Sequence, residues 1–213
     1  PRARPLGSMN WRRVLWHEFV HVITLQKTNN RMPRWLSEGI SVYEEYTGDD
    51  AWGQRLDANF ESVVNGNGYP TLEDLNRYFT TPGSATELMF GYFASGEFVK
   101  FYVDAYGHEA LLQVLDRIGQ GENTTDVVVA ESQETASELN LRFDAHMRVR
   151  CASFDQLAEH SVFKMVLADG DAAANRGDLE AAEKSYVSAF ELYPDYVAED
   201  APLRRLVTLY AKS

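Results

Sequence analysis

Val14-Leu15-Trp16-His17-Glu18-Phe19-Val20-His21-Val22-Ile23 combines a strong helix signal with three unusual polar side chains in this 213-residue chain. The stretch lies in a segment from about Asn10 to Leu25 that contains no Pro or Gly, and Ser8 precedes it as a candidate N-cap, so we predict a helix. Apolar side chains surround almost the whole helix, which predicts a buried helix rather than a surface helix.

His17, Glu18 and His21 are the polar side chains that interrupt this helix. Burying them without partners would cost roughly a few kcal/mol each. Residues four apart lie on one helix face, with Cβ atoms about 5–6 Å apart, so both imidazoles can converge on one metal ion. Glu18 lies one position along and reaches the edge of that site. The alternative is a pair of core histidines bonded to backbone carbonyls, but the intervening Glu18 favours the metal.

A third ligand is expected from the segment 33–48, because a catalytic zinc takes three protein ligands and leaves a fourth position for water. Pro33 suits the first turn of a helix and Gly48 suits its end. Glu38 is the candidate ligand in this second helix. Gly39 beside it removes a side chain where two helices or a substrate must come close.

Glu44 and Glu45 are the alternatives to Glu38. Both lie near the end of the second helix, where we expect them to face solvent. Glu45 shares the helix face of Glu38, so its other interpretation is an outer hydrogen-bond partner that orients a ligand histidine.

The motifs His17-Glu18-Phe19-Val20-His21 and Trp35-Leu36-Ser37-Glu38-Gly39 together resemble the gluzincin metallopeptidases, specifically the bacterial peptidase MA-like group. The resemblance implies that His17, His21 and Glu38 bind one Zn²⁺ ion and that Glu18 activates water. It therefore implies a zinc-dependent peptidase with a peptide or protein substrate. It favours a bacterial extracytoplasmic location, which nothing else in the sequence fixes. The match covers roughly the first half of the chain and becomes loose beyond about Gly121.

Tyr92 is the candidate second donor to the oxyanion that forms during peptide hydrolysis. The sequence Gly91-Tyr92-Phe93-Ala94-Ser95-Gly96 precedes an apolar helix, much as the catalytic tyrosine does in similar peptidases. The alternative for an aromatic side chain in such a run is a place in the core.

The rest of the first domain carries mainly helical signals. We predict helices over about 51–64, 71–79, 85–106 and 108–118, a loop at 65–70, and two weaker helices within 124–151. Little of the sequence alternates with period two, so the fold is expected to be mostly α. Gluzincins place a small sheet, formed by residues before the first motif, beside the metal helix. This chain starts too close to the motif to supply it, so we expect a zincin-like helical core without its upstream β-sheet.

From about Val162 the pattern changes. Small residues, one aromatic residue and a terminating proline follow the order and spacing of a tetratricopeptide repeat (TPR): Gly170, Gly177, Asp178, Ala182, Tyr186, Ala189 and Pro194. We expect a peptidase MA-like domain over 1–155 and a TPR-like helical segment, truncated in its second repeat, over 156–213. Such a segment is interpreted as a docking site for a protein partner or, alternatively, as a helical lid on the peptidase core.

The formal net charge of −12 lies almost entirely beyond residue 50, because the first 50 residues carry seven Lys and Arg against six Asp and Glu. This distribution argues against nucleic acid, whose binding rests on clustered Lys and Arg. A solvated acidic surface is the simplest interpretation, and a cationic partner is the alternative. The sequence contains no run of about 18 apolar residues, so we predict no membrane-spanning helix.

Cys151 is the single cysteine, so neither an intrachain disulfide nor a thiolate zinc site can form. His108, His146 and His160 show no partner spacing and are predicted to be surface or cap residues.

The principal alternative function is a catalytically weak or inactive peptidase-like scaffold whose TPR-like repeats bind a partner protein. The presence of all three ligands and of Glu18 favours the enzyme. A purely structural zinc is disfavoured, because closed structural sites take four protein ligands.

Overall fold

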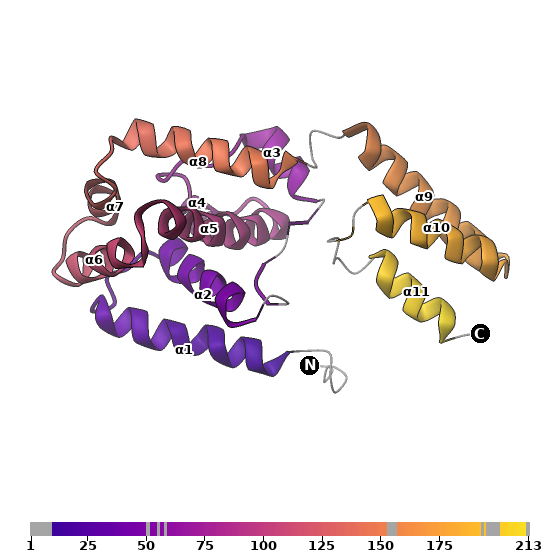
Figure 1. Cartoon of the computed structure of the whole chain (residues 1–213), viewed down its shortest axis with the longest axis horizontal. Coiled ribbons are helices and arrows are strands. Elements are labelled where there is room, and N and C mark those ends of the chain that lie inside the picture. The colour runs from indigo at the N-terminus through magenta and orange to yellow at the C-terminus, as the bar shows by residue number, and fades with distance from the viewer. Residues whose placement is uncertain are drawn as a thin grey trace. The chain divides into compact units, whose positions relative to one another are not determined.

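The structure is a computed structural model that describes residues 10–49, 52–54, 56–57, 59–152, 157–192, 194 and 201–211, with the side chains of 157–161 left out (Figure 1). The chain divides into two compact units. One comprises Pro1–Gln54 and Val63–Arg148, and the other comprises Arg55–Ser62 and Val149–Ser213. The predicted domain boundary near residue 155 lies outside the described residues and stays a prediction.

All regular elements within the described ranges are helices, which confirms the mostly α fold. In chain order they are α1 (Trp11–Lys27), α2 (Arg34–Gly48), α3 (Phe60–Asn67), α4 (Arg77–Thr80), α5 (Ala85–Tyr106), α6 (His108–Gly119), α7 (Thr124–Ser132), α8 (Ala136–Arg150), α9 (Leu157–Asn175), α10 (Leu179–Leu192) and α11 (Pro202–Tyr210).

Helix ends follow local capping chemistry. The cap of α1 is Asn10, whose side chain accepts a hydrogen bond from the Arg13 amide, whereas the predicted cap Ser8 lies outside the described residues. Ser84 caps α5 in the same way, and Gly107 ends that helix with φ +87°, a conformation that suits glycine. These caps place α1 and α5, which both line the candidate site described below.

The segment 51–64 was predicted wrongly as one helix. Residues 52–54 and 56–57 are not helical, and α3 begins only at Phe60. The helix then continues through Asn65-Gly66-Asn67, which the sequence predicted as a loop. Its end lies at Gly68, where φ is +74°. Glycine therefore does mark the stop, but the helix passes the first glycine and ends at the second.

The segment 71–79 is mostly a turn, and its helix α4 is shorter than predicted. The predicted capping contact is nevertheless formed. The amide and the hydroxyl of Thr71 both donate to Asp74 Oδ2, at 3.2 and 2.9 Å. A local side-chain contact thus fixes the turn without starting a full helix.

Helices α2 and α5 pack backbone to backbone. A Cβ atom at Gly39 would lie 2.6 Å from the carbonyl oxygen of Ser95, and one at Gly96 would lie 2.5 Å from Val42 Cγ1. The absence of a side chain at Gly39 therefore allows α2 and α5 to pack closely. This agrees with one of the two sequence interpretations, the close approach of two helices. This contact sets the position of Glu38, the neighbouring residue.

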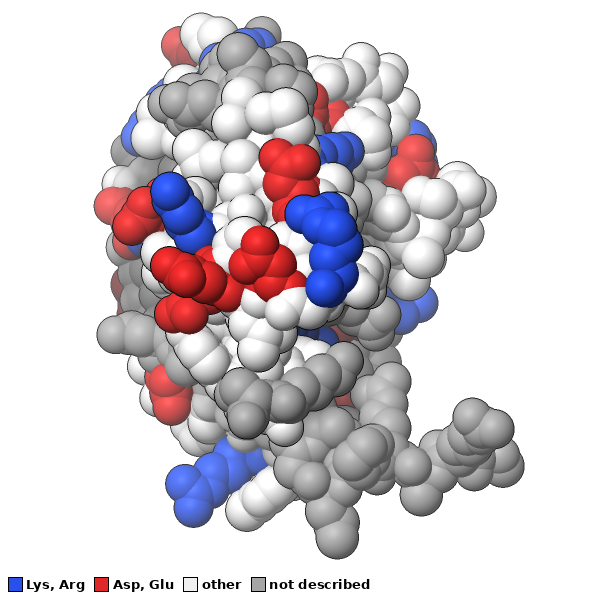
Figure 2. Space-filling model, turned by 90° about the vertical axis from the view of Figure 1, so that its right-hand side faces the viewer, with Lys and Arg blue, Asp and Glu red and all other residues white. Residues whose placement is uncertain are grey.

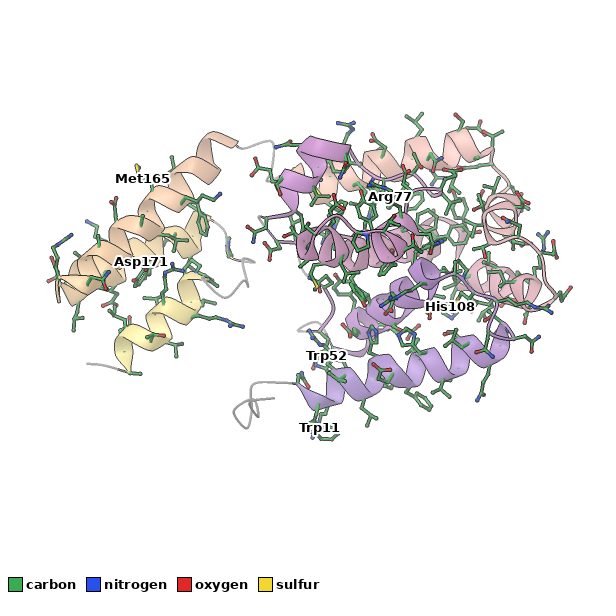
Figure 3. All side chains as sticks on the ribbon, turned by 180° about the vertical axis from the view of Figure 1, so that it is seen from behind. Trp11, Trp52, Arg77, His108, Met165 and Asp171 are labelled. Atoms are coloured by element: carbon green, nitrogen blue, oxygen red, sulfur yellow. The ribbon has the colours of Figure 1, made fainter. Side chains whose placement is uncertain are left out.

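Helix α1 is not buried, contrary to the prediction. Only Val20 and Thr24 of this helix are buried, whereas the large apolar side chains of the opposite face are half exposed or more. These are Trp11, Leu15, Phe19, Val22 and Ile23, with Trp16 at 40%. In Figure 3, Trp11 points away from the neighbouring helices. The main contacts of α1 with other described helices are with α2 and α6, and they cover one side of α1.

The second unit contains α9, α10 and α11, of which α10 packs on both others. Small residues of the repeat pattern lie in the core of this unit: Ala182 and Ala189 are buried, and a Cβ at Gly170 of α9 would meet the ring of Tyr186 of α10. Asp171, labelled in Figure 3, accepts hydrogen bonds from Tyr186 and from Arg205 of α11. A helical hairpin followed by a third helix is therefore present, and its assignment as a TPR stays a prediction.

Charged side chains of both signs lie close together on the face that Figure 2 presents, and neither sign forms one extended patch there. Within the described part of the chain, no helix combines the length and the apolar composition needed to cross a bilayer.

Candidate functional site

The two histidines and the later glutamate of the predicted site lie together. His17 and His21 are one turn apart on α1, with ring centroids 4.7 Å apart and planes at 83°. Glu38 approaches from α2, and its Oε2 lies 3.2 Å from His17 Nε2 and 3.3 Å from His21 Nε2. One ligand atom from each residue falls in a group whose members all lie within 4.8 Å of one another.

This donor set fits zinc. Two imidazole nitrogens and one carboxylate oxygen are the ligands of many catalytic zinc sites. Ligand atoms at about 2.0–2.1 Å from a tetrahedral ion lie about 3.3 Å from one another. Both distances to Glu38 Oε2 agree with that spacing. The residues present therefore match a three-ligand zinc centre.

Each histidine has a hydrogen-bond partner on its other ring nitrogen. His17 Nδ1 lies 2.9 Å from Glu45 Oε1, and His21 Nδ1 lies 2.9 Å from Ser37 Oγ and 3.2 Å from Ser41 Oγ. In the tautomer that carries its proton on Nδ1, each ring donates to these oxygens and turns the lone pair of Nε2 toward Glu38. All three partners come from α2, so the close packing of α1 on α2 holds both rings in place.

Glu45 is buried, and the expectation that it faces solvent was wrong. It lies on the inner face of α2, one turn beyond Ser41, where the His17 ring accounts for its burial. The alternative interpretation, in which Glu45 contacts a histidine of the site, agrees with the structure. Glu44 is half-buried and accepts a hydrogen bond from Thr47, away from the histidines.

The charges of the site are strongly coupled. Burial alone would lower the pKa of His17, but hydrogen bonds to Glu38 and Glu45 outweigh burial and raise that pKa to about 9. Burial would raise the pKa of Glu38, but its hydrogen bonds to His17 and His21 hold it well below its usual range. Zinc binds the neutral imidazole, so a proton and a zinc ion compete for His17.

Tyr92 of α5 lies beside this group. Arg34, at the start of α2, donates from Nε to Glu38 Oε1 at 3.2 Å, and its Nη2 lies 3.5 Å from the Tyr92 hydroxyl. Burial, reinforced by the charge of Glu38, raises the pKa of Tyr92. The phenol therefore keeps its proton at neutral pH and remains a hydrogen-bond donor.

Arg34, like Ser37 and Ser41, is a residue of this site that the sequence interpretation missed. It lies four residues before Glu38, and residues at that spacing face one another on a helix. This spacing is the sequence signal from which Arg34 could have been identified. Its contacts join the candidate ligand Glu38 to the candidate donor Tyr92.

A cavity of about 390 Å³ adjoins the histidines. Its lining comes from α1, α2, α5 and the residue Gln54: Arg13, Val14, His17, Glu18, Val42, Glu45, Gln54, Leu88, Met89 and Tyr92. Glu18 is exposed on α1 and contributes to this cavity next to His17. Of the five predicted site residues, His17, Glu18 and Tyr92 line this cavity, and His21 and Glu38 meet His17 in the adjoining group.

His146 is not a free surface residue as predicted, because its Nε2 lies 2.9 Å from the buried carboxylate of Glu97. This pair joins α8 to α5 and is separate from the group formed by His17, His21 and Glu38. His108 is exposed at the start of α6, and the side chain of His160 lies outside the description. Cys151 is buried, in keeping with a small packing residue.

A comparison with known families matches residues 6–148, about two thirds of the chain, to the model described as the Peptidase MA superfamily. The matched segment contains α1 to α7, nearly all of α8 and every residue of the cavity. No curated protein and no solved structure matches the chain.

Proposed function

The chain belongs to the Peptidase MA superfamily, and from that membership and the geometry of the site we propose that it is a zinc-dependent peptidase of the gluzincin type. The observation that carries the proposal is the convergence of His17, His21 and Glu38, from two helices, at distances that suit one tetrahedral ion. Glu18 and Tyr92 line the cavity beside them.

In this proposal His17, His21 and Glu38 hold the ion, and Glu45, Ser37 and Ser41 orient the two rings. A bound zinc ion supplies Lewis acidity, which lowers the pKa of water from about 15.7 toward about 7 and polarises a carbonyl group. Arg34 donates to Glu38 Oε1, and the other carboxylate oxygen, Oε2, is directed at the histidines.

Glu18 is the proposed general base. Its carboxylate comes from the residue next to His17, is exposed, and borders the cavity. Glu18 accepts a proton from the water that attacks the peptide carbonyl and then passes that proton to the leaving amine. One carboxylate therefore serves as base in the first step and as acid in the second.

Tyr92 is the proposed donor to the oxyanion. A neutral phenol donates one hydrogen bond, and the raised pKa of Tyr92 keeps it neutral. Arg34 holds the Tyr92 hydroxyl on the side of Glu38. The substrate is a peptide or a protein, as the family suggests.

The helices after residue 156 are proposed to form a TPR-like segment that binds a protein partner. The support is the close approach of Gly170 in α9 to Tyr186 in α10 and the burial of Ala182 and Ala189 in the same core, which agree with the repeat pattern. This role is separate from the peptidase site, and its failure would leave the peptidase proposal intact.

The test is Glu18→Gln. We expect the wild-type protein to cut peptides in a library analysed by mass spectrometry, and a chelator to stop the cutting. The Gln variant, which cannot accept the proton, should lose about a hundredfold or more in kcat. The matched control is Glu44→Gln, which removes a glutamate of α2 that does not contact the histidines.

Elemental analysis of the same samples shows whether zinc remains bound. Full activity of the Glu18→Gln variant, with zinc present, would defeat the assignment of Glu18. A wild-type protein that binds zinc but cuts no peptide in the library would support the scaffold alternative instead.

A further inference from the structure

The contact between Arg34 and Tyr92 joins two side chains that come from different helices and are not enclosed. The Arg34 side chain, at the start of α2, is 55% accessible, and Tyr92 of α5 is partly buried at the border of the cavity. Their hydrogen bond, 3.5 Å from Arg34 Nη2 to the Tyr92 hydroxyl, is long. An arginine side chain keeps much rotational freedom unless other groups hold it. This hydrogen bond alone therefore does not fix the direction of the phenol.

Phe79 of α4 contacts both of these side chains. Its ring and the ring of Tyr92 meet edge to face, with centroids 5.1 Å apart and planes at 79°. The central carbon of the Arg34 guanidinium lies 5.7 Å from the centroid of the Phe79 ring, which is within the range of a cation–π contact. One phenylalanine side chain therefore touches the candidate oxyanion donor and its hydrogen-bond partner.

The position of Phe79 is itself well determined. Phe79 is 6% exposed, and α4 packs against both α2 and α5. A Cβ atom at Gly91, the residue before Tyr92, would lie 2.6 Å from Tyr78 Cβ and 3.5 Å from the Phe79 ring. The backbone of α5 thus lies close against α4 directly before Tyr92, and this packing leaves the Phe79 ring little room to move.

Phe79 can affect the reaction only through the side chains that it contacts. Tyr92 lines the cavity beside the histidines, whereas Phe79 is not among the described residues that line it. A phenylalanine that merely fills the core would stabilise the fold whether or not Tyr92 carries a hydroxyl group. A phenylalanine that directs the hydroxyl would matter to the reaction only when that group is present.

We propose that Phe79 is a positioning residue, which holds the Tyr92 ring and the Arg34 guanidinium so that the Tyr92 hydroxyl is directed at the oxyanion. This inference rests on the proposed peptidase function and on the role of Tyr92 in it. A donor of this kind acts best when it is in place before the charge develops. Loss of the Phe79 ring is therefore expected to slow the chemical step and to leave substrate binding nearly unchanged.

The experiment uses the full chain, loaded with zinc, and one peptide that the wild-type protein cuts. Phe79→Leu keeps an apolar side chain and removes the aromatic face. We expect kcat to fall by roughly tenfold, a part of the roughly hundredfold loss that removal of an oxyanion donor causes, and KM to stay within about twofold. The matched control is Phe143→Leu, which removes a buried ring of α8 that contacts Phe98 and Phe101 and should leave kcat within about twofold.

A double-mutant cycle on kcat distinguishes positioning from packing. Tyr92→Phe keeps the ring and removes the hydroxyl, so in this background Phe79 has no donor to direct. Phe79→Leu should then lower kcat by less than about twofold. A merely structural role predicts the same loss of roughly tenfold with and without the hydroxyl.

NMR of the full chain with ¹³C-labelled tyrosine tests the contact without zinc and without turnover. The signals of Tyr92 are those that disappear in Tyr92→Phe. Because an aromatic ring shifts the resonances of a ring that it touches, Phe79→Leu should move the Tyr92 ring signals, and Phe143→Leu should leave them in place.

Equal losses of kcat in the two backgrounds, or Tyr92 signals that Phe79→Leu leaves unchanged, would overturn this inference and leave the peptidase proposal standing. If Tyr92→Phe kept the full kcat, Tyr92 would not be the donor, and this inference would fall while the roles of zinc and Glu18 stood. If the zinc-loaded wild-type protein cut no peptide in a broad library, the proposed function would fall, and this inference with it.

Discussion

Helices α1 and α5 are both rich in large apolar side chains, yet α5 is largely buried and α1 is largely exposed. Helix α5 buries eleven residues between Phe90 and Tyr102, four of them phenylalanines, and α2, α4 and α6 pack against it. Helix α1 buries only Val20 and Thr24 and exposes more than half of Phe19. An apolar circumference therefore predicts where a helix can be buried, and the number of neighbours decides whether it is.

The polar site lies on the side of α1 that is covered. Val20 and Thr24 are buried on that face. His17 and His21 are partly buried there and face Glu38 of α2. The hydrogen-bond partners of the two Nδ1 atoms, Glu45, Ser37 and Ser41, all lie on α2. The geometry of the site therefore depends on the contact between α1 and α2, and does not need the exposed face of α1.

The largest effect expected from this comparison is on stability. Phe98 of α5 is 1% exposed and packs on Trp35 and Phe143, so Phe98→Ala should cost about 3–5 kcal/mol of unfolding free energy. Phe19→Ala, at 54% exposure on α1, should change it by about 0.5 kcal/mol or less. Urea unfolding followed by tryptophan fluorescence measures both, because all four tryptophans precede residue 53. Equal losses would show that α1 is as well covered as α5.

An intermediate effect is expected at the contact between α2 and α5. Gly39→Ala brings a Cβ to 2.6 Å from the Ser95 carbonyl oxygen, so the helices must separate, at a cost of about 1–3 kcal/mol. The control is Gly66→Ala in α3, where no atom lies within 4 Å of the new Cβ and the change should stabilise by about 0.4–1 kcal/mol. The same unfolding measurement distinguishes the two signs. A neutral Gly39→Ala variant would contradict the close packing.

The smallest effect is expected in the second unit, where a polar contact supplements the apolar one. Arg205 donates to Asp171 and lowers its pKa, so the pair contributes stability above about pH 4, the ordinary range of aspartate, and loses it as pH falls through the lower folded value. Both side chains are partly exposed, so the contribution is about 1 kcal/mol or less.

Arg205→Met should therefore destabilise α9 to α11 more at pH 6 than at pH 2. Amide hydrogen exchange in these helices, corrected for the intrinsic rate, measures the difference. An identical loss at both pH values would mean that the ionised contact between Asp171 and Arg205 contributes nothing.

Much of the site could be predicted from sequence, because its information is local. The spacing of His17 and His21 places both rings on one helix face whatever the rest of the fold does. Glu38 could be predicted as the third ligand because it lies on a second helix that must pack on the first. The contacts of Ser37, Ser41 and Arg34 were not predicted, because they depend on how α2 is rotated against α1 and α5, and that rotation is set by Gly39 and Gly96.

The errors in the fold have a common physical cause. The exposure of α1 depends on which elements cover it, and the late start of α3 at Phe60 depends on contacts that local propensity does not contain. By contrast, α5 has clear local signals at both ends, Ser84 and Gly107, and both of its limits were predicted correctly.

The most direct test of the central claim is the zinc content of the purified protein, measured by elemental analysis after dialysis against a weak chelator. We predict about one zinc ion per chain in the wild type, in Glu18→Gln and in the control Glu44→Gln, and very little in His21→Ala and Glu38→Ala. A wild-type protein without zinc, or the same zinc content in all five proteins, would contradict a metal centre formed by His17, His21 and Glu38.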